Sequence, residues 1–354
     1  MRTASKSDGS LPRPRRALVI VNPNSRRGGV AADVERALAV LEHDGVHLVR
    51  AASTERGSLA DLIRHHETVS GIDLVIVGGG DGTINATAPA LLETSLPLGI
   101  LPFGTANDLA RTLGIPADPC AAAEVIAAGH MRRIDIGVVN GHPFFNVASI
   151  GLSVTLAREL TAERKRRWGR LAYAVAAIRA LAQARRPFSA DITREGGETV
   201  HVKTLQIAVG NGRYYGGGMA VWEDARIDDH CLDLYSLEVR SWWRLVLMAL
   251  ALRKGSQRHW RDVRGSCGGA IDIRTRRPRH VNADGEIVTT TPAKFSQLQG
   301  AIQVFAPPHV PKASGDPSSD VSSPSASRDG SHPRQPGAES GTGALWSNDR
   351  GDPT

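Results

Sequence analysis

Residues 74–85 read LVIVGGGDGTIN, and the expected fold is built outward from this stretch. Its first four residues are apolar and mostly β-branched, which is typical of a buried parallel strand. Three glycines follow, and without Cβ atoms they can turn sharply and present their backbone N–H groups to a phosphate. Asp81 comes next, where it could hold a Mg²⁺ that bridges phosphate oxygens, and residues 83–92 have helical character. The stretch predicts a strand, a phosphate-binding turn and a helix, although by itself it also fits a plain glycine turn.

A second stretch of the same kind, LGILPFGTANDLAR, occupies residues 98–111. Residues 98–101 predict another buried strand, and Thr105, Asn107 and Asp108 follow it where a helix should begin. Because the carboxyl ends of parallel strands meet at one edge of a sheet, we expect the two turns to define a crevice there. Asp108 and the later Asp135 could position a metal-bound water, or could equally be a helix cap or a salt bridge between domains.

The predicted sheet starts earlier in the chain, with a strand at 17–21 that ends in NPNSRRGG. Pro23 fixes its φ angle, and Asn22 and Ser25 offer side-chain hydrogen bonds, so this loop also suits a phosphate or a ribose. The next predicted segments are a helix at 31–41, a strand at 46–50 and a helix at 59–68. This alternation predicts a parallel sheet with right-handed crossovers. The sequence lacks the pattern G-x-x-x-x-G-K-[ST], which excludes a P-loop NTPase.

Length and composition predict two domains in one chain. With 354 residues, 41% of them hydrophobic, the chain can bury two ordinary cores. Cys120, Cys231 and Cys267 are odd in number and widely spaced, which predicts neither a disulfide framework nor a zinc site and fits a reducing cytoplasm. The longest strongly apolar run, 245–252, is too short to span a bilayer.

The formal net charge is +7, and the excess of basic residues gathers at 164–170 and 253–279. Such a surface could meet nucleic acid, anionic lipid or a nucleotide, or it could be a solvated face. The basic N-terminal residues lack the apolar core of a signal peptide, and the Ser-, Pro- and Gly-rich end of the chain cannot form a core. Both ends are therefore expected to be disordered.

From residue 134 onward the apolar runs become shorter, which predicts a mostly antiparallel second domain with inserted helices. The expected strands are 134–139, 143–149, 188–194, 204–210, 232–238, 270–275 and 301–305, and the expected inserted helices are 171–184 and 241–254. A further expected helix, 121–128, precedes this domain. The predicted organisation is a basic arm at 1–16, a Rossmann-like α/β nucleotide-binding domain at 17–134, a β-sandwich domain at 135–306 and a tail at 307–354.

Three motifs in this order, NPNSRRGG, GGGDGTIN and PFGTANDLAR, resemble the diacylglycerol kinase catalytic family, specifically its soluble bacterial lipid kinases. Sphingosine and ceramide kinases are more distantly similar. The resemblance continues through RIDIGVVN at 133–140, NVASIGL at 146–152, Asp228-Asp229 and Asp284-Gly285-Glu286, and covers about residues 18–305. It implies a nucleotide-binding α/β domain, a β-rich domain and an active site in the cleft between them.

The resemblance also implies roles for individual residues at matching positions. Glu286 would be the general base that accepts the proton of a lipid hydroxyl, with Asp284 and Asp81 as further catalytic residues. A structural Mg²⁺ would lie at a turn where Asp229 gives its carboxylate and Arg226 and Cys231 their backbone carbonyls, with His230 in place of the usual glycine. ATP would be bound by Asn22, Pro23, Asn24, Ser25, Arg26, Thr54, Gly79, Gly80, Asp81, Gly82, Thr83, Ile84, Asn85, Ala86, Thr105, Asn107 and Asp108.

The predicted function is transfer of the γ-phosphate of ATP, with Mg²⁺, to the hydroxyl of diacylglycerol or a related lipid. The predicted partners are a lipid with a free hydroxyl and an anionic membrane surface met from the cytoplasm, without nucleic acid, and a homodimer is left open. Two alternatives remain: a soluble-metabolite kinase of the NAD kinase type, which shares the G-G-D-G-T turn, and a catalytically silent lipid- or nucleotide-binding protein.

Overall fold

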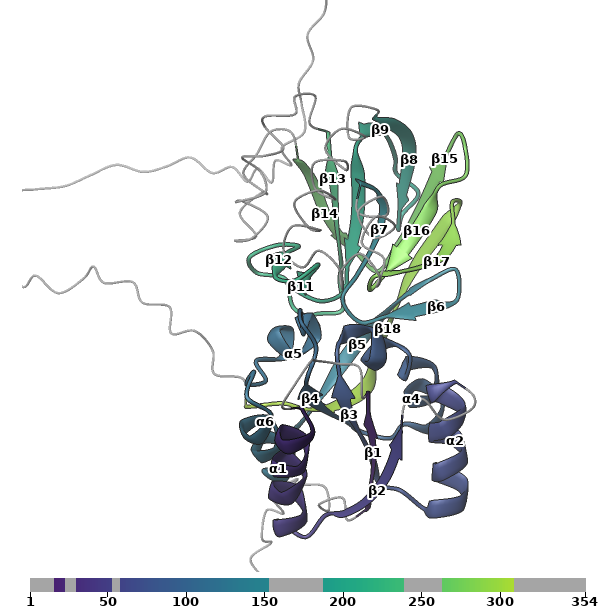
Figure 1. Ribbon diagram of the computed structural model, residues 1–354. Helices are drawn as coiled ribbons and strands as arrows, with labels where there is room; N and C mark the ends of the chain where they lie inside the picture. The colour runs from purple at the N-terminus through teal and green to yellow at the C-terminus, as the bar shows by residue number, and fades with distance from the viewer. Residues whose placement is uncertain (1–15, 23–29, 53–57, 153–186, 239–262, 309–354) are drawn as a thin grey trace, which may run out of the picture. The chain divides into compact units, whose positions relative to one another are not determined.

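The computed structural model describes residues 16–22, 30–52, 58–152, 187–238 and 263–308 (Figure 1). Several predictions lie outside these ranges: the N-terminal arm, the tail, the helices at 171–184 and 241–254, the basic run at 164–170, and the site residues Pro23, Asn24, Ser25, Arg26 and Thr54. Within the described ranges, no helix combines the length and the apolar character that crossing a membrane requires.

The first half of the chain forms the predicted parallel sheet, with the strand order β2-β1-β3-β4. Its strands have fully buried apolar side chains, among them Leu18, Ile76 and Leu101, because helices cover both faces. In Figure 1, α1 and α6 lie on one side of these strands and α2 and α4 on the other. The strands are β1 (Arg16–Val21), β2 (His47–Ala52), β3 (Leu74–Gly79) and β4 (Leu98–Pro102), and the helices are α1 (Val30–His43), α2 (Leu59–Ser70), α3 (Asp81–Asn85), α4 (Ala88–Thr94), α5 (Asp108–Leu113) and α6 (Pro119–Ala127).

The helical character expected over 83–92 is present, but the structure divides this segment into two short helices, α3 and α4. Pro89 lies in the first turn of α4 and has no N–H to give to the carbonyl of Asn85, so one continuous helix would lose a bond there. The buried hydroxyl of Thr87 donates instead to the Ile84 carbonyl at 2.6 Å, which closes the break.

The second half is mostly antiparallel, as predicted, and forms two sheets. One is a six-stranded sheet, β14-β13-β10-β7-β16-β17, and the other continues the parallel sheet through β18-β15-β8-β9, with β5 paired to β18 and β6 paired to β5. Side chains of both sheets, such as Ile150, Val281 and Phe295, share one buried cluster, which makes this half a sandwich. The strands are β5 (Met131–Val139), β6 (His142–Phe144), β7 (Val147–Gly151), β8 (Phe188–Arg194), β9 (Thr199–Thr204), β10 (Gln206–Gly210), β11 (Tyr214–Tyr215), β12 (Met219–Ala220), β13 (Leu232–Leu237), β14 (Val263–Gly268), β15 (Ala270–Thr275), β16 (His280–Ala283), β17 (Glu286–Thr290) and β18 (Ala293–Phe305).

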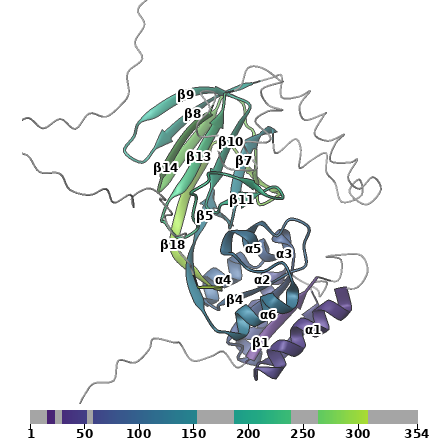
Figure 2. The same ribbon diagram turned by 90° about the vertical axis from the view of Figure 1, so that its left-hand side faces the viewer.

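Strand β18 joins the two halves. The strand predicted at 301–305 extends back to Ala293 and pairs with β4 in parallel and with β5 and β15 antiparallel. Its end packs in the core of the parallel half through Ile302, Val304 and Phe305, while Phe295 lies in the core of the sandwich. Both views of the ribbon show this strand running from one half into the other (Figure 2).

Truncation of the buried end of β18 should therefore destabilise the fold far more than truncation of its exposed middle. Phe305 has 0% of its surface exposed, whereas Leu298 on the same strand is 43% exposed. We expect Phe305→Ala to lower the free energy of unfolding by about 3–5 kcal/mol and Leu298→Ala by less than about 1 kcal/mol, measured by urea denaturation. Equal losses in the two variants would show that the end of β18 is not part of the core.

Candidate active site

The two glycine turns lie against each other at the carboxyl ends of β3 and β4. The backbone N–H groups of Phe103 and Gly104 both donate to the Gly79 carbonyl at 3.1 Å. A Cβ on Gly80 would lie 3.1 Å from the Gly104 Cα, and a Cβ on Gly104 would overlap the Gly80 Cα. Glycine is therefore needed here because two backbones approach without room for a side chain.

Asn22, at the start of the loop after β1, also contacts the first glycine turn. The backbone N–H of Asn22 donates to the Gly78 carbonyl at 2.9 Å, and its side-chain amide donates to the Thr83 hydroxyl at 3.1 Å. Asn107, with a left-handed φ of 51°, donates its amide to the carbonyls of Pro102 and Gly104 at 3.2 and 3.1 Å and so closes the second turn. The structure thus brings together predicted residues from three strand ends.

Asp81 follows the first turn and faces helix α5. Its Oδ1 accepts the backbone N–H of Leu109 at 3.0 Å, which ties the first glycine turn to the helix after the second. In the described part of the chain its other carboxylate oxygen has no protein partner, and the side chain is only half-buried. Asp81 therefore keeps one oxygen for a ligand.

Asp108 opens α5 and is almost fully buried, at 4% exposure. Its Oδ2 accepts the backbone N–H of Gly217 at 2.8 Å, which connects the parallel half to the loop after β11. Burial raises the pKa of its carboxyl, and the nearby charge of Asp81 adds to the rise. Its Oδ1 is buried and has no partner among the residues that the structure describes, and the same is true of the Oδ1 atoms of Asn85 and Asn107. These unpaired acceptors mark a place where a ligand or ordered water would be expected.

The Asp284-Gly285-Glu286 turn connects β16 to β17 and is held by its first residue. The Asp284 carboxylate accepts the backbone N–H groups of three successive residues, Phe145 at 2.7 Å and Asn146 and Val147 at 3.0 Å. Glu286 is exposed, and in the described part of the chain its carboxylate has no hydrogen bond or ion pair. The turn is therefore fixed at Asp284, while Glu286 is left available to a substrate.

The charge of Asp81 also acts on this turn. Burial raises the pKa of the Asp284 carboxyl to about 7 against the opposing effect of the three N–H donors, and the negative charge of Asp81 raises it further. Asp81 therefore interacts with both Asp108 and Asp284, which come from different halves of the chain. These three carboxylates, with the turns that carry them, form the candidate active site.

Asp135 is a buried residue whose hydrogen bonds connect several segments of the chain. Its carboxylate is 1% exposed and accepts the backbone N–H groups of His230 at 2.8 Å and Gly300 at 2.7 Å, with the His230 ring at 3.1 Å. Its own carbonyl accepts the amide of Asn211, which also donates to the Phe145 carbonyl, at 2.8 Å each. Through these two bonds Asp135 is linked to Phe145, one of the residues that hold Asp284. Asp135 therefore has a role within the fold, which the sequence had left open.

The predicted metal turn lies next to Asp135. Asp229 Oδ1 accepts the backbone N–H of Cys231 at 3.2 Å, and its other oxygen has no protein partner in the described part of the chain. Burial raises the pKa of the Asp229 carboxyl, and the charges of Asp135 and Asp228 add to the rise. Arg226 pairs with Asp228 at 3.1 Å, so it could offer a cation only its backbone carbonyl. An exposed carboxylate with a spare oxygen among like charges fits a divalent cation.

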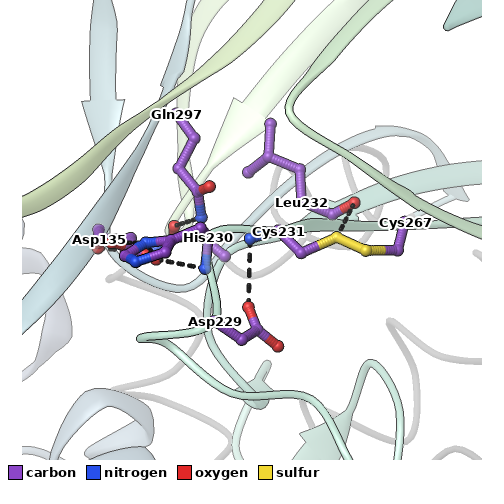
Figure 3. Close-up of a disulfide and its surroundings, with 8 residues drawn as sticks. Asp135, Asp229, His230, Cys231, Leu232, Cys267 and Gln297 are labelled. Atoms are coloured by element: carbon purple, nitrogen blue, oxygen red, sulfur yellow. Dashed lines mark hydrogen bonds and ion pairs between the residues drawn. A yellow bond between two sulfur atoms is a disulfide. The ribbon is translucent and has the colours of Figure 1, made fainter. Parts of the chain in front are cut away.

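His230, which stands in place of the usual glycine, has a φ of 61°, in the left-handed region that favours glycine. The side chain compensates for the backbone cost by contacting Asp135, as Figure 3 shows.

The prediction that the cysteines form no disulfide is wrong for one pair. Cys231 and Cys267 are bonded, with their Cα atoms 5.8 Å apart (Figure 3). The two lie 36 residues apart, and only the pairing of β13 with β14 brings them together.

Sequence reasoning also missed Asn211 and Gly217. The signal for both was the run NGRYYGGG at 211–218, whose glycines are typical of a tight loop near a ligand.

The contact between the glycine turns can be tested with two alanine substitutions. Gly104→Ala should lower the free energy of unfolding by about 1–3 kcal/mol, because its Cβ would force the turns apart. Gly82→Ala is the control, since no atom lies within 4 Å of its new Cβ and the residue is inside α3, and it should be neutral or stabilise by up to about 1 kcal/mol. Urea denaturation measures both, and a neutral Gly104→Ala would contradict the close approach.

The Asp284 carboxyl should make stability depend on pH. Because folding raises its pKa from 3.8 to about 7, the stability from this group is full below about pH 4 and is lost as pH rises through about 7. Relative to Asp284→Asn, we expect the free energy of unfolding of the wild type to fall by up to about 1.4 kcal/mol per pH unit in this window. A difference between the two proteins that stays constant with pH would contradict the raised pKa.

Comparison with known proteins places this chain in a family. Residues 16–139 match the diacylglycerol kinase catalytic domain, and residues 146–306 match the YegS C-terminal NAD kinase beta sandwich-like domain. Diacylglycerol kinases of Mycobacterium tuberculosis (strain ATCC 25618 / H37Rv) and Staphylococcus aureus (strain MRSA252) are each 31% identical to this chain, over 82% and 83% of it and 94% and 93% of those proteins.

A solved structure agrees with these matches. The crystal structure of a diacylglycerol kinase from Bacillus anthracis str. Sterne aligns with a TM-score of 0.68 and 26% identity, over 84% of this chain and 99% of that one. The resemblance and the fold class expected from the sequence motifs are thus confirmed. The chain belongs to the diacylglycerol kinase family of lipid kinases.

Proposed function

We propose that this protein transfers the γ-phosphate of ATP to the hydroxyl of diacylglycerol or a closely related lipid, which gives phosphatidic acid or its analogue. The observation that carries the proposal is a series of hydrogen bonds that links the glycine turns to the turn that presents Glu286. Asp108, after the second glycine turn, accepts the N–H of Gly217; the loop that contains Gly217 starts at Asn211, whose N–H donates to the carbonyl of Asn146, and the N–H of Asn146 donates to Asp284. A phosphate-binding turn and an available carboxylate thereby belong to one site, as phosphoryl transfer to an alcohol requires.

The nucleotide would bind along the glycine turns. Gly79, Gly80, Gly82 and Gly104 have no side chains to cover their backbone, and Asn22 and Thr83 offer polar groups next to them. The buried, unpaired Oδ1 atoms of Asn85, Asn107 and Asp108 support a bound polar ligand here. The remaining residues proposed for ATP are Pro23, Asn24, Ser25, Arg26, Thr54, Ile84, Ala86 and Thr105.

Two places suit Mg²⁺. Asp81 has a spare carboxylate oxygen beside the proposed phosphates, and Asp229 has one at the turn behind the site, where the carbonyls of Arg226 and Cys231 would complete the set. When bound, the cation at Asp81 would offset the negative charge of the phosphates. The clustered charges of Asp81, Asp108 and Asp284 support a cation there, because each of the latter two carboxyls has a pKa raised partly by Asp81.

Glu286 would take the proton of the lipid hydroxyl as that oxygen attacks the γ-phosphorus. Its exposure and lack of a protein partner support this role, because a general base must reach the proton that it accepts. Asp284 would position the turn rather than take the proton, since its carboxylate is occupied by three backbone N–H groups. The formal net charge of +7 supports peripheral contact with the anionic membrane that supplies the lipid.

The role of Glu286 can be tested with purified protein, labelled ATP and lipid in mixed micelles. We expect Glu286→Gln to lower turnover by about 10² or more while ATP affinity stays near normal, because only proton transfer is lost. Glu198→Gln, at an exposed carboxylate in the β8–β9 turn, is the matched control and should keep full activity. Unchanged turnover in Glu286→Gln would remove this residue from the mechanism.

The acceptor is tested in the same assay by offering diacylglycerol, sphingosine, ceramide and NAD separately. We expect the label to appear in diacylglycerol or another of the lipids. Transfer to NAD alone would replace the proposal with a soluble-metabolite kinase, and retained ATP binding without any transfer would favour a silent binding protein.

A further inference from the structure

The bonded cysteines have an acidic neighbour on the same face of the sheet. Cys231 immediately precedes β13, and Asp233 is two residues further along, so their side chains point to the same side of the strand. The pairing of β13 with β14 puts Cys267 directly opposite Asp233. One ligand atom of each of these three residues, the two Sγ atoms and a carboxylate oxygen, lies within 4.8 Å of the others. Two sulfurs and a carboxylate oxygen thus converge on one point.

We propose that Cys231, Asp233 and Cys267 form a binding site for a thiophilic divalent cation such as Zn²⁺ when the disulfide is reduced. Thiolates and carboxylates bind Zn²⁺ at about 2.0–2.3 Å, which separates neighbouring ligands of a tetrahedral ion by about 3.3–3.8 Å. In the disulfide state the three ligand atoms already lie within 4.8 Å of one another, so side-chain movements that separate the two sulfurs would be enough to form the site. Three protein ligands would leave a fourth position for water.

The exposure of the three residues gives an ion a way in. Cys231 is buried, at 6% exposure, Asp233 is half-buried and Cys267 is exposed. An ion or a reductant can therefore reach the cluster from the side of β14. The buried sulfur, by contrast, is shielded from competing ligands in solution, which favours retention of an ion once it is bound.

The disulfide and the ion are alternative states of the same cluster. Two molecules of a small thiol reduce the disulfide to two cysteine thiols and leave as their own disulfide. One divalent cation then binds the two sulfurs as thiolates and releases two protons. Both the disulfide and the bound ion would connect Cys231 to Cys267 of β14. Cys231 follows His230, which bonds the buried Asp135. The cluster therefore keeps this turn in place whether the protein is oxidised or reduced.

This site differs from the Mg²⁺ turn in its donor atoms. At the Mg²⁺ turn, Cys231 would give its backbone carbonyl, and Asp229 its carboxylate. The cluster proposed here uses the Cys231 sulfur, which points to Cys267 (Figure 3). Because sulfur ligands select Zn²⁺ over Mg²⁺, the two sites would take different ions.

The test uses the full chain, reduced with a phosphine under anaerobic conditions and titrated with Co²⁺, whose thiolate complexes absorb in the near ultraviolet. We expect one equivalent to bind, to show thiolate absorption and to be displaced by Zn²⁺. Cys231→Ser or Cys267→Ser should weaken binding by about tenfold or more, and Asp233→Asn should weaken it while keeping the thiolate absorption. Cys120→Ser is the matched control, because Cys120 is the free cysteine of the chain and lies in α6, and it should bind as the wild type does.

Comparing the oxidised and reduced wild-type protein tests the site without a substitution, so the result does not depend on whether a variant folds. Wild-type protein with its disulfide intact, verified by mass spectrometry, should bind no Co²⁺ with thiolate absorption, and reduction of the same sample should create the site. The proposal is overturned if the reduced wild type binds no equivalent, or if Cys120→Ser abolishes binding. Since the readout is metal absorption, neither result depends on whether the chain is a kinase.

Discussion

The three hydrogen bonds that Asp284 accepts from Phe145, Asn146 and Val147 are the contact on which the candidate site depends. Three consecutive N–H groups cannot turn toward one carboxylate and also stay in a regular ladder, so the chain must leave its strand there. This explains why the single strand predicted over 143–149 is wrong and β6 and β7 take its place. The same bonds fix the turn between β16 and β17, and with it the position of Glu286.

The candidate site concentrates negative charge, which is unfavourable for the folded protein. Asp284 and Asp108 are carboxyls whose pKa is raised by burial and by Asp81, so their ionised forms are unfavourable without a nearby cation. Elsewhere in the described chain such charges are met by the protein itself: Arg132 and Arg226 bond Asp228, and the pKa of that carboxyl is lowered even though burial would raise it. The contrast supports the proposal that Mg²⁺ and the nucleotide complete the site at Asp81.

The parallel half was predictable because its signals are local. The apolar run before Gly78 and the glycines after it lie in one short stretch, and the carboxyl ends of neighbouring parallel strands must share an edge, which was enough to expect Asn22, Thr83 and Asn107 near one another. Contacts between distant residues could not be predicted in this way. Asp284 bonds residues almost 140 positions earlier, and the Cys231–Cys267 bond depends on which strands become neighbours. The length of β18 was missed because its polar, partly exposed middle hides the strand pattern.

The central claim, that the glycine turns and the Asp284-Gly285-Glu286 turn form one phosphoryl-transfer site, is tested most directly by a crystal structure with a non-hydrolysable ATP analogue and Mg²⁺. The account predicts that the phosphates lie along Gly79 to Gly82 and Gly104, with the terminal phosphate between Asp81 and the turn that carries Glu286. A nucleotide bound elsewhere, or a terminal phosphate facing away from Glu286, would contradict it.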